Sequence, residues 1–151
     1  MVVKRVDARP EDLREAALRL LARREHSAQE LSRKLRRKGW PDRLVAEGIG
    51  DLAEAGLQSD ERFAESFVRS RAEKSYGPVR IRAELGERGI DRALSDRALA
   101  ALQFDWLAQA AKWYERRFGV DEASDFKEKQ RRRQALARRG FDESVLRELI
   151  D

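Results

Sequence analysis

Two short runs of the sequence concentrate positive charge, and their residues are the ones best suited to bind a partner chemically. Arg33–Lys38 holds five cations and no carboxylate, and Lys129–Arg139 holds six cations and no carboxylate. Guanidinium and ammonium groups bind phosphate and carboxylate oxygens, so both runs suit an extended polyanion or an acidic protein groove. The helix dipole favours cations near a helix C-terminus, but that effect accounts for only part of each run.

Residues for catalysis or for transition-metal binding are scarce in this sequence. His26 is the only histidine, and there is no cysteine. No GxxxxGK[ST], GxSxG or HExxH motif occurs. His26 directly precedes Ser27, which is suited to cap a helix, so we expect a surface histidine beside a helix start rather than a catalytic base. We therefore predict a protein that is not an enzyme and has no cofactor or metal.

The composition predicts an all-helical protein outside the membrane. Charged residues make up 40% of the chain, with nine Gly and three Pro, and period-two runs of β-branched residues are missing. The longest uncharged stretch, Ala98–Phe104, is far shorter than the roughly 18 apolar residues of a membrane span. The first residues lack the apolar core of a secretory signal, so we expect a cytoplasmic protein, and we expect it to be a monomer.

Four aromatic residues lie close together in the last third of the chain: Trp106, Trp113, Tyr114 and Phe118. Such a group could stack on nucleic-acid bases. The helical spacing of Trp106, Trp113 and Tyr114 instead places them on or near one helix face, which is typical of core packing. We favour the core interpretation.

The elements that must position the cationic runs recur three times. Gly39, Gly89 and Gly140 are separated by 50 and 51 residues. A leucine stands four residues before each glycine, and an apolar residue follows it directly: Leu35, Leu85 and Leu136 before, and Trp40, Ile90 and Phe141 after. This pattern predicts a helix that ends at a left-handed glycine, with the next apolar residue folding back on the last turn. Asp91 and Asp142 are suited to cap the helix that follows.

A further helix precedes each copy, and an apolar stripe at helical spacing marks it. The stripes are Ala16, Ala17, Leu20 and Leu21; Phe63, Ala64, Phe67 and Val68; and Trp106, Leu107, Ala110 and Ala111. We therefore predict helices near 10–24, 27–38, 42–55, 60–74, 78–88, 92–103, 105–118, 125–139 and 142–150. The predicted fold class is all-α, with three tandem three-helix repeats in an elongated, curved, solenoid-like array stabilised by stacking between neighbours. We expect an N-terminal tail at 1–9 and repeats at 10–58, 59–104 and 105–151.

Ordered residues in all three copies match a known pattern. The first copy has Arg24-Glu25-His26-Ser27, Glu30-Leu31, Lys34-Leu35 and Lys38-Gly39. The second has Leu57, Ser59-Asp60, Phe63-Ala64, Arg71, Gly77, Ile81, Leu85 and Gly89-Ile90, and the third has Lys127, Lys129, Leu136 and Arg139-Gly140-Phe141. This set, over roughly residues 13–150, resembles the RecX regulatory protein family. The chain departs from the pattern at Pro41, which replaces a capping residue, and at Arg132, which stands where the other copies have Leu31 and Ile81.

The resemblance implies a bacterial cytoplasmic regulator of the RecA recombinase, without catalysis or a cofactor of its own. Members of that family lodge in the groove of the recombinase filament on single-stranded DNA and restrain filament growth, ATP hydrolysis and strand exchange in recombination and DNA repair. We predict that the partner is contacted by a charged face and by four residues of the middle repeat. The face comprises Arg33, Lys34, Arg36, Arg37, Lys38, Arg131, Arg132, Arg133, Arg138 and Arg139, and the middle repeat adds Arg71, Lys74, Tyr76 and Arg80.

Two other functions fit the same cationic surface. A tandem helical-repeat protein could bind DNA directly and act without a recombinase, or a scaffold could join acidic proteins. Association with bare single-stranded DNA and with a recombinase filament, measured over a salt series, separates these three functions.

Overall fold

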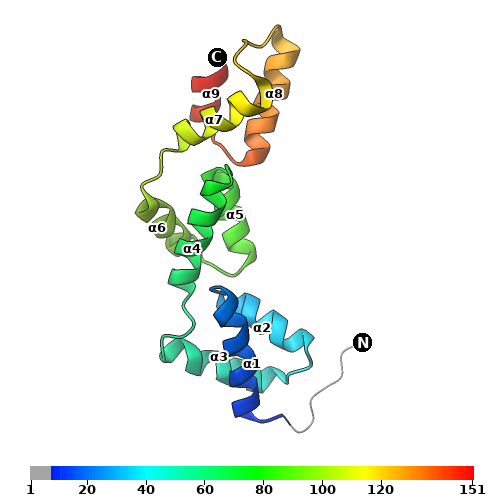
Figure 1. The fold of residues 1–151 in the computed structure, drawn as a ribbon, viewed down its shortest axis with the longest axis vertical. Coiled ribbons are helices and arrows are strands. Elements are labelled where there is room, and N and C mark those ends of the chain that lie inside the picture. The colour runs from blue at the N-terminus through cyan, green and yellow to red at the C-terminus, as the bar shows by residue number, and fades with distance from the viewer. Residues whose placement is uncertain (1–7) are drawn as a thin grey trace.

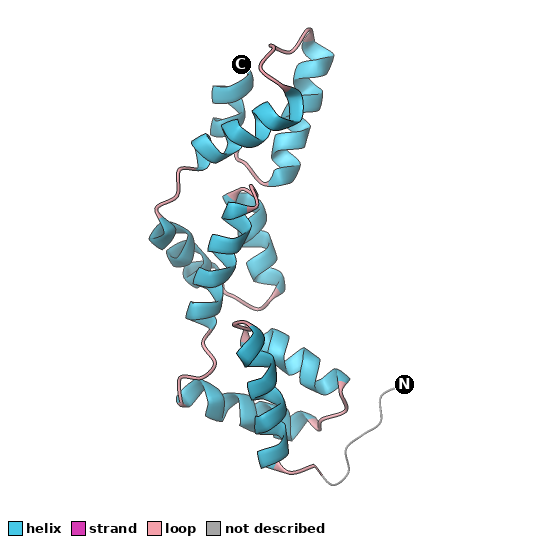
Figure 2. Ribbon diagram, viewed as in Figure 1, coloured by secondary structure: helices cyan, strands magenta, loops and turns pink. Residues whose placement is uncertain are grey.

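The computed structural model describes residues 8–151, and over that range the chain forms nine α-helices and no strand (Figure 2). The helices are α1 (Pro10–Arg23), α2 (Ala28–Arg37), α3 (Asp42–Glu54), α4 (Asp60–Glu73), α5 (Pro78–Glu87), α6 (Arg92–Leu102), α7 (Trp106–Phe118), α8 (Phe126–Arg139) and α9 (Glu143–Ile150). Each end lies within one residue of its predicted position, and the all-α prediction is confirmed. The predicted tail, residues 1–9, lies outside the described residues except for its last two.

The helices form three groups of three that follow one another along the long axis of the molecule (Figure 1). We call them repeat 1 (α1–α3), repeat 2 (α4–α6) and repeat 3 (α7–α9). Each repeat encloses its own hydrophobic core: Leu31 and Leu35 lie in the first, Ile81 and Leu85 in the second, and Leu136 in the third. Each of these five side chains is fully buried.

Apolar stacking between neighbouring repeats is smaller than the sequence predicts. Within the described chain, Trp106 is the side chain that packs against two cores, those of repeats 2 and 3. The remaining apolar clusters close within a single repeat, because each three-helix group brings its apolar faces together on its own. The joints between repeats therefore depend largely on polar contacts.

The predicted helix ends are present in all three repeats. Gly39, Gly89 and Gly140 have φ angles of 94°, 83° and 101°, which lie in the left-handed region that glycine adopts readily. The residue after each glycine donates its backbone N–H to the carbonyl of the leucine five positions earlier, at 3.2 Å for Trp40, 3.0 Å for Ile90 and 3.2 Å for Phe141. The chain therefore folds back on the last turn of α2, α5 and α8 in the same way.

The second helices of the three repeats, α2, α5 and α8, form a head-to-tail row. The C-terminal end of α8 meets the start of α5, where the Gly77 N–H donates to the Arg139 carbonyl at 2.8 Å. The C-terminal end of α5 meets the start of α2, where the Gln29 amide donates to the Glu87 carbonyl at 3.2 Å. Figure 1 shows this second-helix row along one side of the molecule, with α6 and α9 on the other side. Both cationic runs of the sequence therefore belong to the same row.

Candidate partner-binding surface

Several predicted contact residues are exposed on the second-helix row. Arg33 and Arg37 on α2 and Arg138 on α8 are exposed, and none has an ion-pair partner among residues 8–151. Lys38 and Lys74 are exposed as well. The side chains of Arg33, Arg37 and Arg138 can approach a partner without first breaking an ion pair to a described carboxylate.

Other predicted contacts are exposed but paired within the protein. Arg36 lies 3.3 Å from an Asp42 carboxylate oxygen, and Arg80 lies 3.1 Å from Glu84. Arg131 donates to both carboxylate oxygens of Glu128, at 2.9 and 2.8 Å. The exposed Arg36–Asp42 pair contributes little to stability, so Arg36 can exchange partners at low cost.

Arg132 does not lie on the surface. Its side chain is buried, with a residue exposure of 7%, and it donates to Glu128 at 3.0 Å, to the Tyr114 hydroxyl at 2.9 Å and to the Asp121 carbonyl at 3.0 Å. Hydrogen bonds from Arg131 and Arg132 lower the pKa of Glu128 to about 2. Because a buried charge is tolerated when its donors are satisfied, repeat 3 can hold an arginine where its neighbours hold aliphatic side chains. Arg132 is therefore not part of the exposed contact surface.

Arg133 is also engaged internally. Its guanidinium pairs with Glu143 and, at 3.0 Å, with Asp151, and its side chain is largely covered. These contacts connect α8 to α9 and to the last residue of the chain. Arg133 therefore serves repeat 3 rather than an exposed face.

The four predicted residues of the middle repeat lie at the joint between repeats 2 and 3, and three of them contact one another there. The ring of Tyr76 lies within 4.0 Å of the Arg71 guanidinium and within 4.5 Å of the Arg80 guanidinium, measured to the ring centroid. Arg139 of α8 lies over the same ring at 3.9 Å and donates to the Ser75 carbonyl at 3.2 Å. Arginine stacked on an aromatic face is a stabilising contact. Tyr76, Arg71 and Arg139 therefore hold this joint together.

Ser75 completes the same joint. It is buried and has a φ angle of 68°, which is uncommon for a residue with a side chain. Its hydroxyl accepts hydrogen bonds from Gln109 at 2.9 Å and from Arg116 at 3.3 Å, both on α7. The end of α4 is thus bonded to α7 as well as to α8.

The joint between repeats 1 and 2 is a polar clasp. One carboxylate oxygen of Asp60 accepts from the Ala28 N–H at 2.8 Å and from the Gln58 amide at 3.0 Å. The Gln58 amide also donates to the His26 carbonyl at 3.3 Å, and Arg62 pairs with Glu25 at 2.9 Å. The sequence alone indicates Asp60 as a first-turn carboxylate of its own helix. The structure shows that it also binds the first N–H of α2, a contact across 32 residues that no local pattern reveals.

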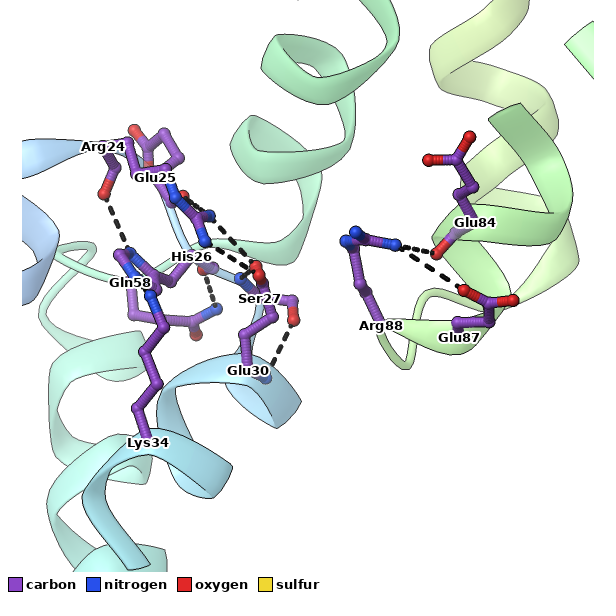
Figure 3. Close-up of polar contacts among 10 residues, drawn as sticks. All are labelled: Arg24, Glu25, His26, Ser27, Glu30, Lys34, Gln58, Glu84, Glu87 and Arg88. Carbon is purple, nitrogen blue, oxygen red and sulfur yellow. Dashed lines mark hydrogen bonds and ion pairs between the residues drawn. The ribbon is translucent and has the colours of Figure 1, made fainter. Parts of the chain in front are cut away.

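His26 is buried, and the prediction that it lies on the surface is wrong. Its exposure is 1%, its Nδ1 lies 3.0 Å from the Arg24 carbonyl, and its Nε2 lies 2.8 Å from the Lys34 amino group (Figure 3). An ammonium group only donates, so Nε2 accepts and the neutral ring carries its proton on Nδ1. Burial lowers the pKa of His26 from its ordinary value, and burial together with the positive charge of Arg24 lowers the pKa of Lys34.

A hollow of about 280 Å³ lies between α2 and the end of α5, and we call it the α2–α5 hollow. It is lined by Glu30, Arg33, Lys34, Arg37, Glu87 and Arg88. Figure 3 shows Arg88 on the repeat 2 side, across from Ser27 and Glu30. Arg88 is absent from the predicted contacts because no dense run of cations surrounds it in the sequence. Arg88 joins the cations of α2 only because the end of α5 lies next to α2 in the fold.

The aromatic group of repeat 3 packs in the core, as predicted. Trp106, Trp113 and Tyr114 are partly buried against the third core, and Phe118 lies 5.3 Å from Tyr114 between ring centroids. Within residues 8–151, no cluster of three or more His, Asp or Glu side chains could hold a metal ion. In the same range, none of the helices combines the length and the apolar character that crossing a bilayer requires.

Comparisons with known proteins match all three repeats. Family models for RecX match as its first three-helix domain at residues 14–52, its second at 59–99 and its third at 104–150. The chain is 49% identical over 140 residues to the regulatory protein RecX of Halorhodospira halophila, covering 93% of this chain and 87% of that one. It is 42% identical over 141 residues to the regulatory protein RecX of Pseudomonas entomophila, covering 93% and 91%.

Solved structures show the same fold. The crystal structure of RecX from Lactobacillus salivarius matches with a TM-score of 0.76 and 25% sequence identity, covering 93% of each chain. A second crystal structure, of a regulatory protein RecX, matches with a TM-score of 0.79 and covers 93% of this chain and 72% of that one. The order of the helices and their placement are thus shared with these proteins.

Proposed function

Because the chain belongs to the RecX family of regulatory proteins, we propose that it regulates the RecA recombinase by binding in the groove of the recombinase filament on single-stranded DNA. In this proposal it restrains filament extension, ATP hydrolysis and strand exchange. It acts in the cytoplasm as a monomer, without catalysis or a cofactor. The repeats at 10–58, 59–104 and 105–151 are its binding units.

One observation carries the proposal: the second-helix row places exposed, unpaired arginines from repeats 1 and 3 along one side of an elongated molecule. Arg37 lies on α2 and Arg138 on α8, and neither has an ion-pair partner in the described part of the chain. Contacts that are weak one at a time add strongly when a single body makes them together. A row of this kind suits a groove that winds past several subunits.

The row also supports a physical account of inhibition. A protein that contacts neighbouring filament subunits at once binds best when those subunits have one fixed spacing. By binding that spacing best, it shifts the filament toward one arrangement and away from the others. The polar joints of the row set which spacing is preferred.

The test is the rate of ATP hydrolysis by the recombinase on single-stranded DNA, with increasing amounts of the regulator. We expect Arg37→Glu/Arg138→Glu to need a much higher concentration than the wild type for the same inhibition. Arg43→Glu/Arg97→Glu changes the charge equally on α3 and α6, outside the second-helix row, and should inhibit like the wild type. Equal loss in both variants would show that only net charge matters.

Direct DNA binding without a recombinase is the second candidate, since unpaired arginines also fit phosphates. Fluorescence anisotropy with bare single-stranded DNA and with a preformed filament, over a salt series, separates the two. Tighter binding to the filament at every salt concentration supports regulation of the recombinase. Equal affinity for both would favour the second candidate.

A further inference from the structure

We propose that the α2–α5 hollow binds one backbone phosphate of a nucleic-acid strand. This proposal rests on the proposed function and deepens it, because it names the partner group that one part of the surface contacts. It also assigns a role to Arg88, which lies outside the cationic runs of the sequence.

The hollow carries more positive charge than its own carboxylates balance. Four cations and two carboxylates line it. Of the two carboxylates, Glu30 is already engaged: Arg24 donates to its two oxygens at 3.2 and 3.0 Å, and the Ser27 N–H donates to it at 3.2 Å. Arg33 has no ion-pair partner in residues 8–151, nor does Arg37 on the next turn of α2. Glu87, the second carboxylate, lies 3.9 Å from Arg88. Arg33, Lys34 and Arg37 therefore have no carboxylate partner within residues 8–151, and an anion would balance them.

Lys34 shows that the cations are crowded. Its amino group contacts the neutral ring of His26 at 2.8 Å instead of a carboxylate. Burial lowers the pKa of Lys34, and the nearby charges of Arg24, Lys38 and Arg23 lower it further. An anion placed in the hollow would relieve this repulsion, which is the usual way in which clustered cations bind a ligand.

Arg88 is held in place for this role. Its side chain donates to the Glu84 carbonyl at 2.9 Å, and its guanidinium lies over the Phe67 ring at 4.7 Å from the centroid. Gln29 and Glu87, which hydrogen-bond at 3.2 Å, fix the distance between the two walls. A guanidinium that is already oriented loses less entropy when it binds, and its fork fits the oxygens of a phosphate. A phosphate is tetrahedral and presents more oxygens than a planar carboxylate. It can therefore accept hydrogen bonds from donors on both walls of the hollow at once.

The proposal is tested by the salt dependence of binding to a short oligothymidylate, followed by fluorescence anisotropy between about 50 and 200 mM salt. Losing one phosphate contact on a single strand lowers the slope of log K against log salt by about 0.7 in magnitude. We expect that loss for Arg33→Gln/Arg88→Gln. The matched control, Arg43→Gln/Arg97→Gln, removes the same charge from α3 and α6 and should keep the wild-type slope. Thermal unfolding of each variant reports that the fold is retained.

Two further probes identify the group that is bound. An oligothymidylate with neutral methylphosphonate linkages should show no difference between the wild type and Arg33→Gln/Arg88→Gln. A polyglutamate peptide should compete weakly for the strand. If the peptide competes as well as the strand and the hollow variant weakens both equally, the hollow binds carboxylates and the proposal is overturned.

The outcome is independent of the wider function. An unchanged slope in Arg33→Gln/Arg88→Gln, while the wild type still inhibits recombinase ATP hydrolysis, overturns the phosphate site and leaves the proposed function in place. A slope that falls by about 0.7 in magnitude in Arg33→Gln/Arg88→Gln, but not in Arg43→Gln/Arg97→Gln, supports the phosphate site. A wild type that fails to inhibit the recombinase counts against the proposed function instead.

Discussion

Replacing Asp60 with alanine should open the joint between repeats 1 and 2 without unfolding either repeat. One oxygen of Asp60 accepts two hydrogen bonds, from the Ala28 N–H at 2.8 Å and from the Gln58 amide at 3.0 Å. Hydrogen bonds to a charged group contribute about 1.5–3 kcal/mol each. The loss is smaller than the sum of two such bonds, because the Ala28 N–H can form a hydrogen bond with water once the carboxylate is removed. We therefore expect the joint to lose about 2–3 kcal/mol.

Native-state hydrogen exchange of the Ala28 amide measures this loss directly, because that amide donates to Asp60. In Asp60→Ala, the Ala28 amide should exchange about 30- to 150-fold faster, which is the same free energy expressed as an opening equilibrium. Amides in the core of repeat 2, such as that of Leu85, should keep their wild-type exchange. Asp60→Asn retains a carbonyl oxygen as acceptor and should restore much of the protection.

The matched control is Glu61→Ala, which removes the neighbouring exposed carboxylate from the same helix turn. It should change the exchange of Ala28 very little, because Glu61 makes no hydrogen bond with α2 in the described structure. If Glu61→Ala accelerates Ala28 as much as Asp60→Ala does, the clasp is a general charge effect and our reasoning is wrong.

Three further predictions concern stability, each measured by chemical or thermal unfolding. Leu85→Ala should cost about 2–5 kcal/mol because Leu85 is fully buried in the second core, whereas Leu107→Ala, at an exposed site, should cost far less. Gly77→Ala should destabilise the protein because a Cβ would collide with the backbone of Gly140, whereas Gly86→Ala, in open space within α5, should stabilise it by about 0.5–1 kcal/mol. Stability should fall as the pH drops below about 6.5, because burial lowers the pKa of His26 and the unfolded chain takes up the proton first.

Each of these predictions has a result that would contradict it. A change near zero in the free energy of unfolding for Leu85→Ala would mean that Leu85 does not pack in the core of repeat 2. If Gly77→Ala and Gly86→Ala change the free energy of unfolding equally, the backbone of Gly140 does not approach Gly77 closely. The neutral ring of His26 stabilises the folded protein. This contribution is fully present above the unfolded pKa of about 6.5 and is lost as the pH falls toward the lower folded pKa. A rise in stability over that interval would mean that the ring is charged in the folded protein.

The helices and their ends could be predicted because their signals are local. An apolar stripe, a capping residue and a glycine at the end of a turn act over a few residues, so Ser27 and Asp91 cap their helices as the sequence indicates. The same holds for Gly89 and Gly140, where the backbone is left-handed.

The joints could not be predicted, because their partners are far apart in the chain. Arg139 stacks on Tyr76, and Asp60 binds Ala28, with nothing in the intervening residues to indicate either contact. The residues next to His26 in the sequence predict a surface position, although both of its ring nitrogens have partners inside repeat 1. Arg132 shows the converse: a charged side chain in a dense cationic run is buried because three acceptors surround it.

The head-to-tail contacts of α2, α5 and α8 leave the N-terminal end of α8 and the C-terminal end of α2 outside both joints. Gene duplication could therefore add another three-helix unit at either end by the same kind of contact, without rebuilding what already exists. The reach of such a molecule would lengthen in whole steps of one repeat.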